Sequence, residues 1–314
     1  MNQLSLFDLH CDTALRMLEE KQPLSDNAFA VSLKKAEPFA QYIQVMALYT
    51  SSRLTDAEGW LQLKRMLHNL QKDPSVAGGA VGLTSVCPER ADGVTLLLGI
   101  EDARVLECRP ERLEELYGMG VRIFTPLWSG ETCIGGAHDT EAGLTDFGEL
   151  AVRRALELGM IPDISHESPA SAEEIFDLAA EFRRPVIASH SNAYAVCPVS
   201  RNLRDGQIRS IVDCGGLIGL NLYTKFLASD RAASAEDVLR HAEYFLEHGA
   251  GDALAMGGDM DGAELPPDLG DLSLLPNLAE CFLRHNYPEQ LVRNIFFENA
   301  YRVMHAALSN HEPQ

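Results

Sequence analysis

Imidazole and carboxylate side chains follow short apolar segments at several places that are far apart in this chain. The side chains concerned are His10, Asp12, Glu101, His166, His190, Asp259 and Asp261. Imidazole nitrogen and carboxylate oxygen together suit a borderline cation such as Zn²⁺. A single histidine at a strand end is more often a packed or hydrogen-bonding residue, so the prediction depends on the combination.

The spacing of these groups indicates what they could do together. His10 and Asp12 are two positions apart, and strand side chains repeat every two residues, so both should face the same way. A carboxylate such as Glu101 can offer one oxygen to each of two cations and reduce their repulsion. Water acidified by two such ions is a nucleophile at neutral pH, which predicts hydrolytic chemistry.

The apolar segments that precede these groups predict strands, and the segments between them predict helices. The expected strands are Leu6–His10, Ile43–Tyr49, Thr95–Ile100, Arg122–Pro126, Ile161–Ser165, Val186–Ser189, Leu217–Leu222 and Ala253–Gly257. The expected helices are Ala57–Gln71, Pro110–Leu116, Phe147–Leu158, Ser171–Glu181, Asp205–Val212 and Ala235–His248. The long first gap should hold an additional hairpin or helix before Ile43.

Eight strands that alternate with helices predict an α/β protein with a TIM (β/α)8 barrel, and a doubly wound open sheet is the alternative. No G-x-G-x-x-G follows the first strand and no P-loop is present, so nothing supports nucleotide binding. In a barrel the carboxyl ends of the strands meet at one mouth, which would bring the polar groups together. A loop at Gly262–Leu275 should cover one end.

Two further segments, Leu278–His285 and Pro288–Leu308, predict extra C-terminal helices, and Ser309–Gln314 should be a flexible tail. The 314 residues show no break in composition, so we expect one barrel domain over residues 1–314.

The composition excludes several classes of partner. The formal net charge is −20, which disfavours nucleic acid and anionic membranes as partners. No apolar run is long enough to span a bilayer, and no signal peptide is evident. The seven cysteines are scattered and form no CxxC pair, which is typical of reduced thiols in a cytoplasmic protein.

Longer motifs give the chain a resemblance to a known family, from Asp8 to about Met304. The segments that carry it are DLHCDT, GIED, GVRIFTPLW, GLTDFGELAVRRALELGMIPDISHES, VIASHSNAYAVCPVSRNLRD, IGLNLY and GGDMDG. Together they resemble the membrane dipeptidase (renal dipeptidase) family, peptidase family M19, within the amidohydrolase-type barrels. The resemblance implies a bacterial-type enzyme with two zinc ions, a dipeptide substrate and a homodimer.

The resemblance also implies a role for individual residues of the metal site. His10 and Asp12 would bind one zinc ion, His166 and His190 would bind the other, and Glu101 would bridge the two.

Three further residues match positions that act on the substrate in the family. Asp259 would take a proton from the attacking hydroxide and deliver it to the leaving amine. Arg201, in SRNL, would hold the free carboxylate of the dipeptide, because its planar fork meets a carboxylate with two parallel bonds. Tyr223 would donate a hydrogen bond to the same carboxylate. A surface ion pair for Arg201 and a packed aromatic for Tyr223 are the structural alternatives.

One residue departs from the family pattern. Many members have a histidine after the fourth strand that contacts the substrate and helps to stabilise the oxyanion, and TPLW places Trp128 there. An indole N–H can donate a hydrogen bond but cannot carry a charge or accept a proton. His138, in the following loop, is a possible substitute.

The expected activity is therefore hydrolysis of L-L dipeptides, and of L-D dipeptides by the resemblance. Two alternatives stay open. The same metal scaffold could serve a lactonase, a deaminase or an N-acyl amino acid deacylase, or the chain could be a metal-binding homologue with impaired catalysis.

Overall fold

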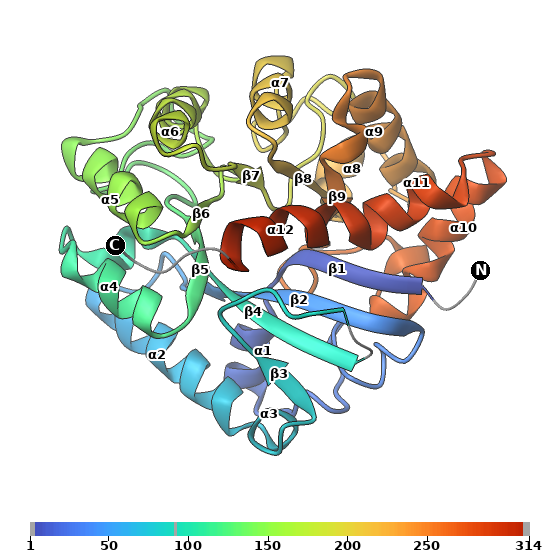
Figure 1. Cartoon of the computed structure of the whole chain (residues 1–314), viewed down its shortest axis with the longest axis horizontal. Coiled ribbons are helices and arrows are strands. Elements are labelled where there is room, and N and C mark those ends of the chain that lie inside the picture. Colours follow the sequence, from blue (N-terminus) through green and yellow to red (C-terminus); the bar gives the residue numbers. More distant parts are fainter. Residues whose placement is uncertain (1–3, 91–92, 310–314) are drawn as a thin grey trace.

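Parallel strands surrounded by helices form the core of the computed structural model, which describes residues 4–90 and 93–309 (Figure 1). The strands are β1 (Leu4–Cys11), β2 (Phe39–Tyr49), β3 (Val81–Leu83), β4 (Gly93–Glu101), β5 (Val121–Thr125), β6 (Ile161–Pro162), β7 (Ile187–Ala188), β8 (Leu217–Leu220) and β9 (Leu254–Met256). Their order is β6-β5-β4-β2-β1-β9-β8-β7, with β3 beside β4. A parallel bridge between Asp163 and Ile187 joins the two ends of this order. The predicted TIM barrel is confirmed, and the open-sheet alternative is wrong.

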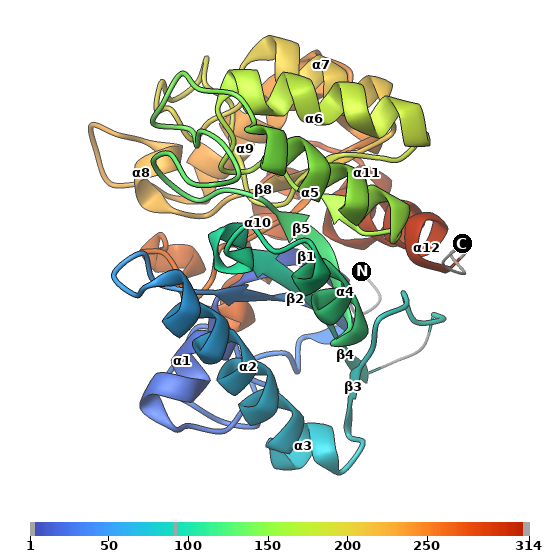
Figure 2. The same cartoon turned by 90° about the vertical axis from the view of Figure 1, so that its left-hand side faces the viewer.

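The helices lie outside the strands, with α1, α2 and α3 on one side and α5, α6 and α7 on the opposite side (Figure 2). Their bounds are α1 (Thr13–Glu20), α2 (Asp56–Lys72), α3 (Pro74–Ala77), α4 (Glu111–Gly118), α5 (Asp146–Glu157), α6 (Pro169–Phe182), α7 (Asp205–Asp213), α8 (Thr224–Leu227), α9 (Ala235–Glu247), α10 (Pro276–Arg284), α11 (Glu289–Arg293) and α12 (Asn299–Ser309). Several starts are capped by side chains. Thr55 and Glu58 form a reciprocal capping box at α2, and Thr145 caps α5. The additional element expected before Ile43 is helix α1.

Strands β6, β7 and β8 end earlier than the sequence predicts. At the barrel mouth their backbone groups form hydrogen bonds with side chains instead of with a neighbouring strand. Asp163 Oδ1 accepts hydrogen bonds from the amides of Ser165 (3.1 Å) and Ser189 (2.9 Å). Asn192 Nδ2 donates to Asn221 O (2.9 Å), and Asn221 N donates to Asn192 Oδ1 (3.2 Å). The backbone groups at these strand ends are therefore satisfied, but by side chains and not by the hydrogen bonds of a β-sheet.

An irregularity in β1 sets the direction of His10. Asp8 pairs with Gln44 and Cys11 pairs with Met46, so three steps along β1 match two steps along β2. Such a bulge reverses the alternation of side chains, and it turns His10 towards the barrel axis while Asp8 points outwards. As expected, Cys11 lies on the face opposite His10, with its sulfur 3.4 Å from Met46 Sδ.

Apolar side chains fill the barrel below the mouth, and α12 closes the other end (Figure 1). All eight barrel strands contribute, through Phe7, Leu9, Ile43, Val45, Leu97, Ile123, Ile161, Ile187, Leu217 and Ala255. The single helix predicted over Pro288–Leu308 is instead α11, a π-helical turn at Asn294–Glu298, and α12. The wider turn brings Phe297 against Phe7, with ring centroids 6.4 Å apart.

Some expectations have other outcomes. Strand β3, which the sequence does not predict, pairs with the first half of β4 through Val81 and Val94. The predicted loop at Gly262–Leu275 contains two short 3₁₀ turns. Of the predicted tail, residues 310–314 lie outside the described residues. Among the helices that the structure describes, none has the length and apolar character needed to cross a membrane.

Candidate metal centre

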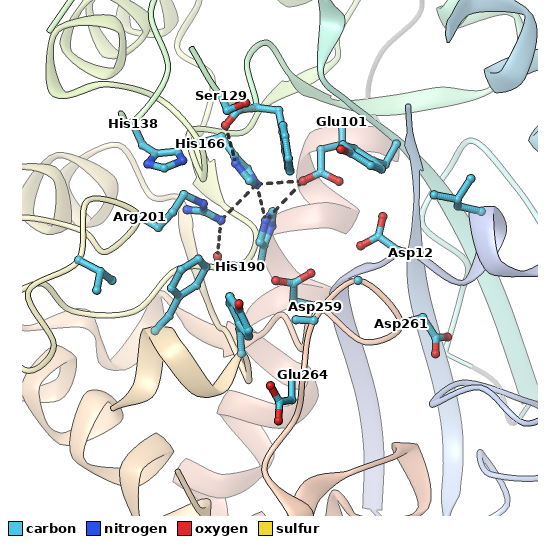
Figure 3. Close-up of a pocket in the computed structure, with 18 of the residues that line it drawn as sticks. Asp12, Glu101, Ser129, His138, His166, His190, Arg201, Asp259, Asp261 and Glu264 are labelled. Atoms are coloured by element: carbon cyan, nitrogen blue, oxygen red, sulfur yellow. Dashed lines mark hydrogen bonds and ion pairs between the residues drawn. The ribbon is translucent and has the colours of Figure 1, made fainter. Parts of the chain in front are cut away.

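The predicted polar groups meet around one cavity of about 550 Å³ at the carboxyl ends of the barrel strands (Figure 3). Its walls include Asp12, Glu101, Trp128, His138, His166, His190, Arg201, Tyr223 and Asp259. His10 lies at the base of the same cluster and contacts Glu101 and Asp12. The structure therefore brings together all nine residues that the sequence singles out as ligands or as groups that act on the substrate.

Glu101 stands at the centre of the histidines, and its two oxygens face different neighbours. Oε2 lies 3.4 Å from His10 Nε2. Oε1 lies 2.9 Å from His166 Nε2 and 3.7 Å from His190 Nε2. The carboxylate is thus shared among three histidines, and the rings of His10 and His190 themselves lie only 3.8 Å apart.

Several buried polar atoms in this cluster have no good partner. His10 Nε2 and Asp12 Oδ1 form no hydrogen bond, although these residues are only 3 % and 6 % exposed. His166 Nε2 and His190 Nε2 are 2.9 Å apart, a contact in which two lone pairs face each other unless one carries a proton. Unsatisfied buried groups cost free energy, and cations between these atoms would satisfy them. The donor set therefore fits a metal centre.

The protonation states of the histidines and of Glu101 bear on whether these groups can bind a metal. Burial lowers the pKa of both His166 and His190, and the Arg201 guanidinium lowers both further, so these imidazoles are neutral and keep a lone pair. Burial opposes ionisation of Glu101, but His10 and His166 outweigh it and lower the pKa of that carboxyl. His10 differs: burial opposes its charged form, but Glu101 and Asp12 outweigh burial and raise the pKa of this imidazole well above its usual range. His10 would therefore release its proton on binding a metal.

A buried carboxylate that the sequence analysis missed orients His190. Asp163 Oδ2 accepts hydrogen bonds from Thr125 Oγ1 (2.8 Å) and Ser189 Oγ (2.6 Å), and Ser189 Oγ is 2.7 Å from His190 Nδ1. Since Ser189 donates to Asp163, it accepts from Nδ1–H, which leaves the Nε2 lone pair directed at the cavity. His166 Nδ1 likewise lies 3.0 Å from Trp128 O.

A second missed carboxylate, Asp8, supports His10 from the outer face of β1. It accepts from the amides of His10 and Gly258, both at 3.0 Å, and from Gln44 Nε2 at 3.1 Å. Asp8 thereby joins β1 to the segment that carries Asp259. An acid inside an otherwise apolar strand, two or three residues before a histidine, is the sequence signal common to Asp8 and Asp163.

Asp259 lies at the edge of the cluster, in a left-handed conformation with φ 55°. Its Oδ2 accepts from Asn221 Nδ2 at 3.1 Å. Desolvation in the pocket is the largest influence on this carboxyl and raises its pKa to about 7, although His10 opposes the shift. The chain approaches the carboxylates closely here: a Cβ at Gly262 would lie 2.0 Å from Asp12 Oδ2, so a larger residue would displace the Asp12 carboxylate.

The other aspartate of GGDMDG, Asp261, has its carboxylate engaged in the fold. It accepts from Thr13 Oγ1 (2.6 Å) and from the amides of Ala30 (2.6 Å) and Val31 (3.3 Å). Asp261 therefore anchors the long loop after α1.

Arg201 is 5 % exposed and reaches into the cavity beside the histidines. Its Nη2 lies 3.2 Å from His166 Nε2 and 3.3 Å from His190 O, and its guanidinium lies 5.3 Å from the ring centroid of Phe226. Its Nε has no hydrogen-bond partner. Burial lowers the pKa of Arg201 to about 10, so it stays charged at neutral pH. Tyr223 packs edge-on against Phe226 on the same wall.

Trp128 lies on the wall of the cavity, beside His166. Its ring lies 6.2 Å from that imidazole and 5.1 Å from the ring of Tyr49. His138 lines the same side of the cavity, with its ring 6.0 Å from His166 and Nδ1 2.8 Å from Ser200 Oγ. Burial lowers the pKa of His138 to about 4, so this imidazole is neutral.

Comparison with known proteins connects this geometry to an enzyme family. The model of the membrane dipeptidase family (Peptidase family M19) matches residues 1–314. An uncharacterized protein in the pqqA 5′ region of Klebsiella pneumoniae is 32 % identical over 228 residues, which are 68 % of this chain and 83 % of that protein.

Solved structures agree. A metallo peptidase from Rhodobacter sphaeroides, liganded with a phosphinate mimic of L-Ala-D-Ala, is 26 % identical with a TM-score of 0.88, over 96 % of this chain and 99 % of that one. The M19 dipeptidase AC, also 26 % identical, has a TM-score of 0.89 over 98 % of this chain and 99 % of that one. From its matched family, its barrel and its cluster of metal-ligand side chains, the chain belongs to the membrane dipeptidase family, Peptidase family M19, and is a metallo-dipeptidase.

Proposed function

We propose that this metallo-dipeptidase uses two zinc ions and hydrolyses dipeptides with an L-residue or a D-residue in the second position. The observation that carries the proposal is the division of Glu101, whose two oxygens face His10 on one side and His166 with His190 on the other. His10 and Asp12 would hold one ion, His166 and His190 the other, and Glu101 would contact both. When bound, the ions would polarise the scissile carbonyl and supply an activated water at neutral pH.

Asp259 is the proposed acid and base. Its Oδ2 is held by Asn221, which leaves Oδ1 free to take a proton from the attacking water and return it to the leaving amine. Burial in the pocket favours the protonated form of this carboxyl, which can return a proton to the leaving amine, and bound cations would favour the carboxylate that accepts one.

Arg201 is the proposed clamp for the C-terminal carboxylate. It is charged, buried and held against Phe226, so little side-chain entropy is lost when a carboxylate binds. A carboxylate bound here fixes the distance from the C-terminus to the scissile bond, so that a single residue lies on the leaving side of that bond. Tyr223 lies on the same wall and would add a hydrogen bond from its hydroxyl.

Trp128 and His138 replace the histidine found in many family members. The Trp128 ring excludes water from one side of the cavity, between Tyr49 and His166. Since His138 Nδ1 faces Ser200 Oγ, a neutral imidazole with its proton on Nε2 could donate to a developing oxyanion.

The tolerance of a D-residue is supported by the Rhodobacter sphaeroides structure, which holds a mimic of L-Ala-D-Ala. We also propose that the protein is cytoplasmic, which its seven free cysteines support. The family motifs support a homodimer. Light scattering of the purified protein tests the dimer, which a monomeric mass would contradict.

One preparation tests the activity. The purified protein is analysed for zinc and assayed with L-Ala-L-Ala, L-Ala-D-Ala, N-acetyl-L-alanine and a lactone. We expect at least two zinc ions per chain and hydrolysis of both dipeptides. Preference for the N-acetyl amino acid or the lactone would instead indicate another hydrolase on this scaffold. Full zinc content without turnover on any substrate would indicate an impaired homologue.

A further inference from the structure

A second group of metal-ligand side chains lies outside the barrel, on helices α9 and α10, which pack against each other. It consists of Glu236, in the first turn of α9, Cys281 in α10, and His285, directly after the end of α10. Their ligand atoms all lie within 4.8 Å of one another. None of the three lines the active-site cavity.

The local geometry directs all three groups to one point. Cys281 and His285 are four residues apart, on consecutive turns of one helix face. Glu236 Oε2 comes from the neighbouring helix and lies 2.9 Å from His285 Nε2. The thiol is fully buried, while the imidazole and the carboxylate are about half exposed, so a cation from solvent would meet these two groups first and the sulfur behind them.

The three groups have the chemistry that Zn²⁺ prefers. One thiolate sulfur, one imidazole nitrogen and one carboxylate oxygen leave a fourth tetrahedral position for water. The charges of a thiolate and of Glu236 together offset the two positive charges of the ion. Burial and Glu236 raise the pKa of the Cys281 thiol, although Arg284 also contacts it and acts in the opposite direction. The thiol is thus protonated when free, and it would release its proton on binding metal.

We propose that Glu236, Cys281 and His285 form a separate zinc site that joins the start of α9 to the end of α10. Without metal, the cluster provides an exposed contact between Glu236 and His285, and such surface contacts contribute little to stability. With metal, it joins two helices that flank the loop 262–275. That loop contacts both helices through Asp268, which accepts from the Ala235 amide and from Asn277 Nδ2, both at 3.0 Å.

Cobalt substitution tests this site independently of catalysis. A thiolate bound to Co²⁺ gives an intense charge-transfer band in the near ultraviolet, and the proposed ligands in the active-site cavity include no thiol. The full-length protein is freed of metal and titrated with Co²⁺. We expect the thiolate band to appear with about one equivalent of Co²⁺, in addition to the metal in the cavity. Zinc added to this protein should abolish the band and raise the Tm by several degrees.

Two variants and one control decide the assignment. Cys281→Ser should abolish the band, and the surface substitution His285→Gln, which leaves the buried core intact, should weaken Co²⁺ binding at this site at least about 10-fold. The double variant Cys108→Ser/Cys133→Ser is the matched control, because these two thiols also lie side by side. It should keep the band. No thiolate band at saturating Co²⁺, or a band that persists in Cys281→Ser, would overturn the site, whatever the dipeptidase assays show.

Discussion

Replacement of Asp163 by asparagine should disturb the metal centre through the protonation of His190, without touching any proposed ligand. In the protein, Asp163 Oδ1 accepts from the amides of Ser165 and Ser189. In Asp163→Asn the carbonyl oxygen of the new side chain must take that place, because an NH₂ group cannot face two donors. The NH₂ group then points at Ser189 Oγ, where the carboxylate had accepted a hydrogen bond at 2.6 Å.

The relay to His190 is thereby reversed. Ser189 Oγ now accepts from the NH₂ group of the introduced asparagine, so its hydrogen turns to His190 Nδ1, which lies 2.7 Å away. That bond moves the imidazole proton to Nε2, the atom that faces the cavity. To keep the ligating tautomer, Ser189 must direct its hydrogen to Ser165 Oγ, at 3.2 Å. The cost is about one hydrogen bond, roughly 1–3 kcal/mol, which corresponds to a loss of about 10- to 100-fold in metal affinity.

The assay measures the zinc concentration that restores dipeptidase activity to metal-free enzyme in buffered zinc, so that it reports on the cavity alone. Asp73→Asn is a matched control, because Asp73 is also buried and accepts from the amides of Leu24 (2.9 Å) and Ser75 (3.0 Å), but lies outside the site. It should lower stability and leave zinc affinity unchanged. A folded Asp163→Asn protein with the zinc affinity of the parent would refute the relay.

Three further results are expected. Asp259→Asn should keep its metal and lose about 10²- to 10⁴-fold in kcat, because the proton acceptor is gone; a parental kcat would remove Asp259 from the reaction. An amide in place of the substrate's C-terminal carboxylate should lower kcat/KM by about 10- to 100-fold, from the loss of charged hydrogen bonds worth about 1.5–3 kcal/mol, and Arg201→Ala should abolish the difference between acid and amide. His241 accepts from the Ala193 amide and contacts Leu227 O, both at 3.1 Å, and burial lowers its pKa to about 4. The unfolded chain therefore takes up the proton first as the pH falls below about 6.5. Relative to His241→Gln, the protein should lose about 2 kcal/mol of unfolding free energy between pH 7 and pH 5, and parallel pH profiles would contradict this.

The order of the barrel strands was predictable, because each apolar segment is followed by a helical one and few folds accommodate eight such units. The ends of β6 and β7 were not, since Asp163 and not the strand ladder binds the amides there. The alternation of side chains along a strand predicted that His10 and Asp12 face the same way. His10 does face the cavity, but alternation alone does not explain it. Strict alternation would leave His10 on the same face as Asp8, and a shift in register between β1 and β2 turns it inwards.

In the candidate site, too, some residues were predictable from the sequence and others were not. Groups at the strand ends could be predicted because the barrel topology alone brings them to one mouth. Asp8 and Asp163 act from behind the ligands through backbone amides and hydroxyls, and these contacts depend on register, which the sequence pattern does not contain. The neutral state of His138 likewise depends on burial by chain segments that are remote in sequence.

We propose that one carboxylate, Glu101, holds two ions, each with further ligands of its own. Crystals of the zinc-loaded protein, with anomalous diffraction recorded on both sides of the zinc absorption edge, test it most directly. We expect two anomalous peaks in the cavity, one next to His10 and Asp12 and the other next to His166 and His190, with a Glu101 oxygen on each. A single peak, or two peaks without Glu101 between them, would contradict it.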